Sequence, residues 1–186
     1  MSQAVRLPKR LTTSEYFDFE KGASVRHELV GGIIYAIVGS TDRRNIIAGN
    51  LLIAFSTHLP DACQVFEQSM KLRIATEAAE DFYYPDFMVS CDAGDRERLF
   101  REKPSILGEV LSPSTPREDR REKFAAYTQI PTLQEFVLIA QDVPQVELFR
   151  RSNAWRPEHF FLEDSVTFTS AGLTLPVEQI YRRVTF

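Results

Sequence analysis

The sequence predicts a single α+β or α/β domain in which a mixed β-sheet is flanked by helices. The chain has 186 residues, which fits one domain because domains typically hold ~100–200 residues. Segments with strand-like patterns outnumber helical ones, and the helical segments fall at the start, in the middle and after a buried strand, as expected when helices pack on a sheet. Its 44% hydrophobic and 26% charged residues are ordinary for a globular protein. We therefore expect residues 1–186 to form one domain.

The first 60 residues predict a helix, a β-hairpin and a second helix. Thr12–Glu15 supplies capping hydroxyls and an early acid, so a short helix should follow and end at Gly22. Two runs rich in β-forming residues then flank Gly31-Gly32, whose glycines can take the positive φ of a tight hairpin turn. These runs are Arg26–Val30 and Ile33–Val38. Ser40-Thr41-Asp42 caps a helix with apolar residues at helical spacing, which should end before Pro60.

The rest of the chain predicts a series of strands and one more helix. The expected strands are Gln64–Gln68, Leu72–Ala75, Tyr84–Ser90, Ser105–Leu111, Leu133–Ala140, Val146–Arg150, Trp155–Leu162 and Val166–Phe168. Thr115-Pro116-Arg117-Glu118 has the form of a capping box with proline at the first helical position. It should open a helix that reaches about Gln129.

Charge and cysteine content limit the class of protein. The net charge of −4 argues against a broad, sequence-independent grip on nucleic acid, which needs many Lys and Arg side chains. It does not exclude a nuclease, because metal-binding acids lower the net charge. Cys63 and Cys91 form no C-x-x-C pair and are predicted to be reduced thiols. No apolar stretch approaches the ~20 residues of a membrane span, so we expect a cytoplasmic protein.

Two acids are candidate metal ligands. Asp86 follows Pro85 at the head of an apolar run, and Glu109 lies in the next predicted strand, so the two strands are expected to be neighbours. Carboxylate oxygens suit Mg²⁺ or Mn²⁺, and Mg²⁺ is commonly held by one or two carboxylates together with water and a substrate phosphate. Such a site indicates phosphodiester hydrolysis. Taken singly, Asp86 could instead make a turn and Glu109 could be solvated.

The helix after Glu109 adds Asp119, Lys123 and Tyr127 at i, i+4 and i+8, along one helix face. In the functional interpretation, Lys123 points back at the two acids, where its ammonium orients water or offsets charge on the phosphate. Spacing alone favours the alternative, a surface ion pair of Asp119 with Lys123 worth ~0.3–0.5 kcal/mol. Tyr127 would then simply cover the core.

Glu28 is a third candidate acid because it interrupts an otherwise apolar hairpin. It could be exposed or catalytic, and its spacing does not decide between the two. The three histidines, His27, His58 and His159, lack the spacing of metal ligands and are expected to be structural or exposed. The chain contains no G-x-S-x-G, P-loop or G-x-G-x-x-G motif.

Taken together, these segments resemble the Uma-two family of restriction-endonuclease-like proteins in the PD-(D/E)XK nuclease superfamily. The resemblance runs nearly the full length of the chain and is most specific in the Glu-Val-Leu-Ser-Pro-Ser-Thr run with a downstream Asp, Lys and Tyr. The matching pieces are Ser14-Glu15-Tyr16, His27–Gly32, Tyr84–Val89, Glu109–Thr115, and Asp119, Lys123 and Tyr127.

The resemblance implies a restriction-endonuclease-like central mixed sheet flanked by helices, with an N-terminal helix and hairpin. It implies that Asp86 and Glu109 are metal ligands and that Glu28 is an additional active-site acid. The superfamily usually carries a lysine two residues after the second acid, a position that Leu111 fills here. The family pattern supplies Lys123 from the next helix instead, which shifts the balance for that residue toward the catalytic interpretation.

One departure from the family is the pair Arg43 and Arg44, which stands where members often carry a histidine. These arginines could contact phosphates, although solvated surface is the default for such a basic pair. The sequence predicts a Mg²⁺- or Mn²⁺-dependent endonuclease that cleaves DNA as a homodimer, since two-fold assembly presents a site to each strand. The alternatives are an inactive nuclease-fold protein that binds nucleic acid or serves in assembly, and a metal-free hydrolase such as a glycosidase that uses a carboxylate pair.

Overall fold

The computed structural model describes residues 10–37, 39, 41–76, 79–111 and 117–186, apart from the side chains of residues 117–119. By its internal contacts the chain divides into two compact units. Unit 1 comprises Met1–Gly39 and Arg73–Tyr83, and unit 2 comprises Ser40–Leu72 and Tyr84–Phe186. The two units are described separately below, and a single domain over residues 1–186 stays a prediction.

Unit 1 contains the predicted N-terminal helix and hairpin. Its elements are α1 (Thr13–Gly22), β1 (His27–Val30), β2 (Ile33–Ala36), β5 (Glu80–Tyr83) and the last residues of β4 (Lys71–Ala75). The Thr12 side chain accepts a hydrogen bond from the Glu15 N–H and the Glu15 carboxylate accepts one from the Thr12 N–H, so α1 begins with a complete capping box. Gly31 and Gly32 both have positive φ in the turn between β1 and β2. The predicted helix and hairpin are confirmed.

A small aromatic core holds unit 1 together. β1 pairs antiparallel with β2 and also with β5, where Leu29 lies opposite Phe82. Tyr16 from α1 is fully buried, and its ring lies 5.3 Å from the ring of Phe82. The Tyr16 hydroxyl also donates to the backbone oxygen of His27, so the helix is joined to the hairpin by packing and by a hydrogen bond.

Glu80 gives unit 1 a pH-dependent contribution to stability. Its carboxylate accepts hydrogen bonds from Thr13 and Arg73, which lower the pKa of Glu80 below the ordinary value of 4.5. A lowered pKa means that this stabilisation is present above pH 4.5 and is lost as the pH falls through the pKa of the folded state. Replacing Glu80 by Gln should therefore lower the unfolding temperature at about pH 7 and have less effect at about pH 3. Thermal unfolding at both pH values checks this, and an equal decrease at both would contradict it.

Unit 2 contains the remaining helices and the six-stranded sheet. Its elements are α2 (Asp42–His58), β3 (Gln64–Glu67), the start of β4, β6 (Phe87–Ser90), β7 (Phe100–Arg101), β8 (Ile106–Leu111), α3 (Arg117–Tyr127), β9 (Glu135–Ala140), β10 (Gln145–Arg150), a short 3₁₀ helix (Arg151–Asn153), β11 (Pro157–Phe161), β12 (Ser165–Phe168), β13 (Leu173–Pro176) and α4 (Val177–Ile180). The sheet has the order β11-β10-β9-β8-β6-β3. Among the described strands of this sheet, β8 and β9 pair in parallel and the other neighbours are antiparallel, so the predicted mixed sheet is confirmed.

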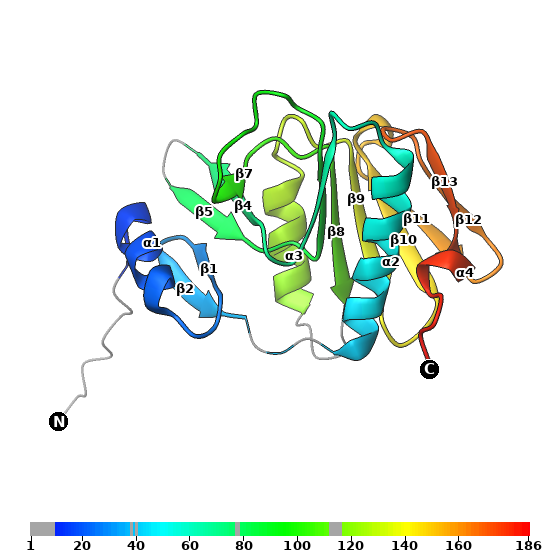
Figure 1. The fold of residues 1–186 in the computed structure, drawn as a ribbon, viewed down its shortest axis with the longest axis horizontal. Coiled ribbons are helices and arrows are strands. Elements are labelled where there is room, and N and C mark those ends of the chain that lie inside the picture. The colour runs from blue at the N-terminus through cyan, green and yellow to red at the C-terminus, as the bar shows by residue number, and fades with distance from the viewer. Residues whose placement is uncertain (1–9, 38, 40, 77–78, 112–116) are drawn as a thin grey trace. The chain divides into compact units, whose positions relative to one another are not determined.

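The six-stranded sheet has a helix on each face (Figure 1). Alternate residues of each strand point to opposite faces. Ile106 and Val110 of β8 lie on one face, within a core cluster that also contains Leu51 and Phe55 of α2. The other face carries Phe136 of β9, whose ring meets α3 aromatic rings edge-on or tilted. Glu109 alternates with Ile106 and Val110 along the strand, which places it on the α3 face.

The structure departs from several predicted boundaries. The predicted strand Tyr84–Ser90 is shorter, because β6 begins at Phe87 and Asp86 stands directly before it. The sequence patterns did not reveal β5, β7, β13 or α4, which are short and carry weak periodicity. α3 ends at Tyr127 rather than near Gln129. Residues 112–116, with the first two residues of the predicted capping box of α3, lie outside the described residues.

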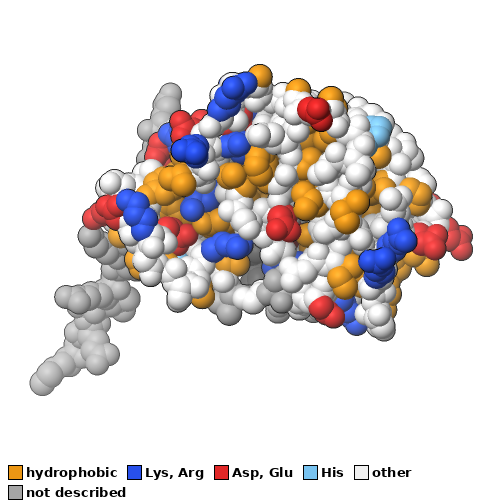
Figure 2. All heavy atoms as spheres, viewed as in Figure 1, with side chains coloured by type: hydrophobic (Ala, Val, Ile, Leu, Met, Phe, Trp, Pro, Cys, Tyr) orange, Lys and Arg blue, Asp and Glu red, His pale blue; other side chains and the backbone are white. Residues whose placement is uncertain are grey.

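Surface charge is of mixed sign on the face drawn in Figure 2. Among the residues described there, Lys and Arg side chains stand in separate small groups between apolar and acidic ones. Charge on this face is therefore arranged in local groups rather than in one broad basic field. No helix in the described part of the chain is long and apolar enough to span a bilayer.

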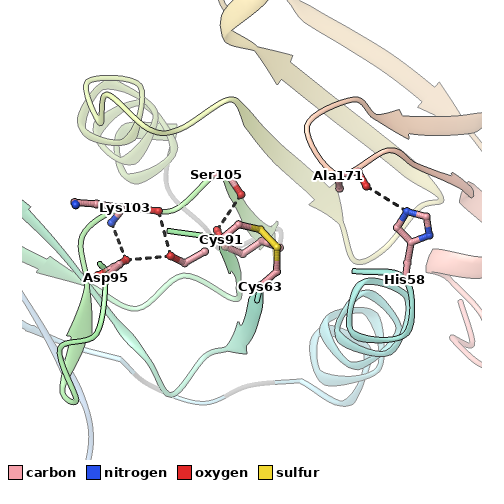
Figure 3. Close-up of a disulfide and its surroundings, with 9 residues drawn as sticks. His58, Cys63, Cys91, Asp95, Lys103, Ser105 and Ala171 are labelled. Carbon is pink, nitrogen blue, oxygen red and sulfur yellow. Dashed lines mark hydrogen bonds between the residues drawn. A yellow bond between two sulfur atoms is a disulfide. The ribbon is translucent and has the colours of Figure 1, made fainter. Parts of the chain in front are cut away.

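The two cysteines form a disulfide, which corrects the prediction of reduced thiols. Cys63 precedes β3 and Cys91 follows β6, and their sulfur atoms are bonded (Figure 3). The register pairs Gln64 with Ser90, so the next residues outward, Cys63 and Cys91, face each other. The prediction considered closely spaced cysteines and missed a pair 28 residues apart that only strand pairing brings together. Because both cysteines are in this disulfide, reduced thiols no longer support the prediction of a cytoplasmic location.

Candidate active site

Asp86 and Glu109 lie opposite each other on neighbouring strands of unit 2. β6 and β8 pair antiparallel, and Phe87 is the partner of Gly108. One step further along this register, Asp86 comes opposite Glu109. Directly opposed residues of an antiparallel pair have Cβ atoms roughly 4.5–5.5 Å apart on the same face. The expectation that the two strands are neighbours is therefore confirmed, and the pairing brings the two carboxylates together.

The carboxylate of Asp86 is fully buried and held by two groups. Arg44 donates to Oδ1 through Nε at 2.7 Å, with its Nη2 also 2.7 Å from Oδ1. The backbone N–H of Val110 donates to Oδ2 at 2.8 Å. Burial raises the pKa of Asp86, while the Arg44 guanidinium, the Val110 N–H and the charge of Lys123 act to lower it. An Asp that served only as a solvated turn residue would not be enclosed in this way.

Glu109 is only 5% exposed and is held from α3. The buried Tyr127 hydroxyl donates to Oε1 at 2.8 Å, and Lys123 Nζ lies 3.4 Å from the same oxygen. The Lys123 side chain is itself only 12% exposed. The spacing of one helical turn between Lys123 and Tyr127 explains why both reach one carboxylate. Lys123 is therefore not the solvated surface residue that spacing alone favoured.

The roles predicted for Glu28 and Asp119 stay predictions. Glu28 is half-buried in β1 of unit 1, where it lies opposite Tyr35 of β2. Its neighbour Leu29 is buried, so the Glu28 side chain points to the other face of the hairpin. The side chain of Asp119 lies outside the described part of the structure. Their proposed roles rest on the sequence.

The structure adds Arg44 and Tyr127 to the cluster as residues that hold the acids. The helix spacing of Tyr127 fitted either a site residue on the face of Lys123 or a core residue. Tyr127 has both roles, because its hydroxyl binds Glu109 and its ring packs edge-on against Phe136. Arg44 was expected at the solvated surface, which is wrong, since its side chain is 24% exposed and paired with Asp86. No sequence signal links Arg44 to an acid 42 residues away.

The donor set fits a hard divalent cation. Asp86 and Glu109 supply carboxylate oxygens from adjacent strands, and both are buried. Mg²⁺ is commonly held by one or two carboxylates, with water and a substrate phosphate completing its coordination. The described residues contain no group of three or more His, Cys, Asp or Glu side chains placed to bind a metal.

Two of the histidines, His27 and His58, make contacts apart from these acids, as predicted. In unit 1 His27 Nδ1 lies 2.8 Å from a carboxylate oxygen of Glu20. In unit 2 His58 Nε2 lies 3.2 Å from the backbone oxygen of Ala171 (Figure 3). Neither contact involves Asp86 or Glu109.

The central mixed sheet with flanking helices is a restriction-endonuclease-like fold. The chain belongs to the Uma2 family, whose description reads "Putative restriction endonuclease" and which matches residues 13–178. It is 31% identical to the uncharacterized protein slr1290 of Synechocystis sp. over 100% of this chain and 98% of that protein. A second Synechocystis protein, sll1609, is 33% identical over 79% of this chain and 84% of its own length.

A solved structure supports the same fold. The crystal structure of a putative nuclease from Anabaena variabilis matches with a TM-score of 0.76, covering 94% of this chain and 99% of that one. The two sequences are only 16% identical, so this likeness concerns the fold alone. It confirms the predicted architecture of a mixed sheet flanked by helices.

Proposed function

We propose that this protein is a Mg²⁺- or Mn²⁺-dependent endonuclease that hydrolyses phosphodiester bonds of DNA. The observation that carries the proposal is the pairing of two buried carboxylates, Asp86 and Glu109, with the Lys123 ammonium 3.4 Å from one of them. Buried carboxylates are costly unless they are paired or bind a metal. Membership of a family described as restriction endonucleases supports phosphodiester bonds as the target.

Each residue of the cluster has a distinct part in this proposal. Asp86 and Glu109 would hold the cation, which when bound polarises the phosphate and lowers the pKa of water. Tyr127 fixes the orientation of Glu109 through its hydrogen bond. Lys123 orients the attacking water or offsets the negative charge that develops on the phosphate. Glu28 enters as an additional active-site acid on the family resemblance alone.

The proposal includes assembly as a homodimer. A duplex presents two antiparallel strands, and a two-fold dimer would place one site at each. The family description supports nucleic acid as the substrate, and the mixed surface charge suits recognition through local contacts.

A second candidate function is a catalytically inactive protein that retains the fold and binds nucleic acid or serves in assembly. The observation that favours it is that both acids already have cationic partners, Arg44 on Asp86 and Lys123 on Glu109. In this alternative the ion pairs are purely structural. The protein would then have no need of a divalent cation.

Calorimetric titration of Mn²⁺ distinguishes the two functions. We expect the wild type to bind Mn²⁺ and Glu109→Gln to lose binding, because the substitution removes one anionic ligand while keeping an acceptor for Tyr127. Glu163→Gln is the matched control, since Glu163 is exposed and lies in another loop. Absence of binding to the wild type, with and without a DNA oligonucleotide, would favour the inactive protein. Equal binding by wild type and Glu109→Gln would place the metal elsewhere.

A further inference from the structure

We propose that Arg44 is a counter-ion that competes with the divalent cation for Asp86. It neutralises the buried carboxylate in the metal-free protein and must leave Oδ1 when the metal binds. The inference rests on the proposed function in one respect, which is that Asp86 is a metal ligand. It goes further because it assigns a role to Arg44, which is to control the access of the metal to Asp86.

The contacts of Asp86 show why binding is competitive. Oδ1 accepts a hydrogen bond from Arg44 Nε at 2.7 Å, and the Nη2 atom of the same guanidinium also lies 2.7 Å from Oδ1. Oδ2 accepts the Val110 N–H at 2.8 Å, a backbone contact fixed by the strand. A cation that used Oδ1 would need a lone pair that Arg44 now occupies. The side chain is the contact that can give way.

Electrostatics point the same way. A guanidinium and a divalent cation on one carboxylate repel each other strongly where water is excluded, and Asp86 is fully buried. Without either cation, the buried carboxylate would lack a compensating charge at Oδ1, which proteins rarely tolerate. Asp86 therefore binds either Arg44 or the divalent cation, and either one compensates the charge of the carboxylate.

Arg44 is placed so that it can leave. It lies in the first turn of α2, and its side chain is 24% exposed, whereas that of Asp86 is 1% exposed. A released guanidinium keeps its planar set of donors, which matches phosphate oxygens well. Substrate phosphate would thus receive the arginine that the metal displaces. Metal and DNA should bind with positive coupling for this reason.

The test compares Mn²⁺ binding by the wild type, Arg44→Gln and Arg43→Gln. Arg43 is a matched control because it lies in the same helical turn and pairs with a different acid, Asp142, at 3.1 Å. We expect Arg44→Gln to lower the Mn²⁺ dissociation constant by about tenfold, within the roughly 5–150-fold range of typical coupled sites, and Arg43→Gln to leave it unchanged. A purely structural Arg44 would give the opposite sign, because its loss would loosen the site and weaken binding.

Thermal unfolding provides a second measurement. Without metal, Arg44→Gln should unfold at a lower temperature than the wild type, and saturating Mn²⁺ should raise its unfolding temperature more than that of the wild type. If Arg44→Gln does not fold without metal, Arg44→Lys replaces it in the titration. A single ammonium occupies Oδ1 less completely than a guanidinium does. We therefore expect Arg44→Lys to have a lower Mn²⁺ dissociation constant than the wild type.

The outcomes separate this inference from the proposed function. If the wild type binds Mn²⁺, Glu109→Gln abolishes binding and neither substitution of Arg44 tightens it, the metal site stands and the counter-ion role is overturned. If neither the wild type nor the Arg44 variants bind Mn²⁺, the proposed metal site fails and the counter-ion role fails with it. Mn²⁺ binding that is tighter in the Arg44 variants and unchanged in Arg43→Gln supports both the metal site and the counter-ion role.

Discussion

Replacing Asp86 by Asn or Glu109 by Gln is expected to abolish DNA cleavage while leaving the fold intact. Each substitution keeps the size of the side chain and removes one negative charge from the pair that would hold the cation. We expect the cleavage rate to fall by at least about a thousand-fold, equivalent to roughly 4 kcal/mol of activation free energy. Cleavage of plasmid and linear DNA with Mg²⁺ and with Mn²⁺ measures this, with circular dichroism to verify folding.

The expectation of an intact fold has a structural basis. In Glu109→Gln the new amide would still offer an oxygen to the Tyr127 hydroxyl, which donates to Glu109 at 2.8 Å in the wild type. In Asp86→Asn the guanidinium of Arg44 would lose its anion, but that side chain is partly exposed and can reach water. Both variants remove a buried charge and keep the packing volume. Loss of activity would therefore report on chemistry rather than on unfolding.

Three further variants limit the interpretation of this experiment. Glu163→Gln changes an exposed acid and should cleave like the wild type. Glu28→Gln tests the additional acid, and undiminished cleavage would remove Glu28 from the proposed active site. A double variant, Asp86→Asn with Glu109→Gln, that retained full activity would refute the proposed nuclease site. Loss of cleavage in every variant, including Glu163→Gln, would instead indicate that the purified proteins are inactive for a reason unrelated to the substitutions.

The strand pair that carries the acids was predictable because the relevant signals are local. An apolar run follows Asp86 and another surrounds Glu109, and a connection of moderate length favours neighbouring strands. Their register then followed from pairing, which sets Phe87 opposite Gly108. The helix spacing of Lys123 and Tyr127 was equally local, and the structure brings both to Glu109.

The contacts that depend on packing between distant segments were not predictable. Arg44 meets Asp86 only because the first turn of α2 lies at the end of the sheet where β6 begins, and no spacing rule encodes that meeting. The Cys63 to Cys91 bond depends on the pairing of β3 with β6 in the same way. The predicted strand Tyr84–Ser90 included Pro85, whereas β6 begins only at Phe87. These contacts depend on how distant segments of the chain pack together, which the residue types alone do not reveal.

Removal of the disulfide is expected to cause a large loss of stability in unit 2. The bond closes a loop with a sequence separation of 28 residues. Such a cross-link restricts the unfolded chain by about 3.5 kcal/mol in the loop-entropy model. We expect the variant Cys63→Ser with Cys91→Ser to lose a free energy of unfolding of this order. Urea unfolding of the wild type and the variant measures it, with and without a reducing agent.

The reducing agent supplies the matched control. It should lower the stability of the wild type to nearly that of the double-serine variant and leave the variant unchanged. A variant as stable as the oxidised wild type would show that the bond is absent or does not constrain the chain. Equal effects of the reducing agent on both proteins would show that it acts elsewhere.

The disulfide and the acid pair lie at opposite ends of β6, so their effects should be separable. Cys91 follows Ser90 at one end, and Asp86 precedes Phe87 at the other. Four strand residues at ~3.3 Å each put more than about 13 Å between them. β6 pairs with β8 on one side, which aligns Asp86 with Glu109, and with β3 on the other. We therefore expect the double-serine variant to retain Mn²⁺ affinity under conditions where it remains folded, and a large decrease would mean that the edge strand β3 helps to position the acids.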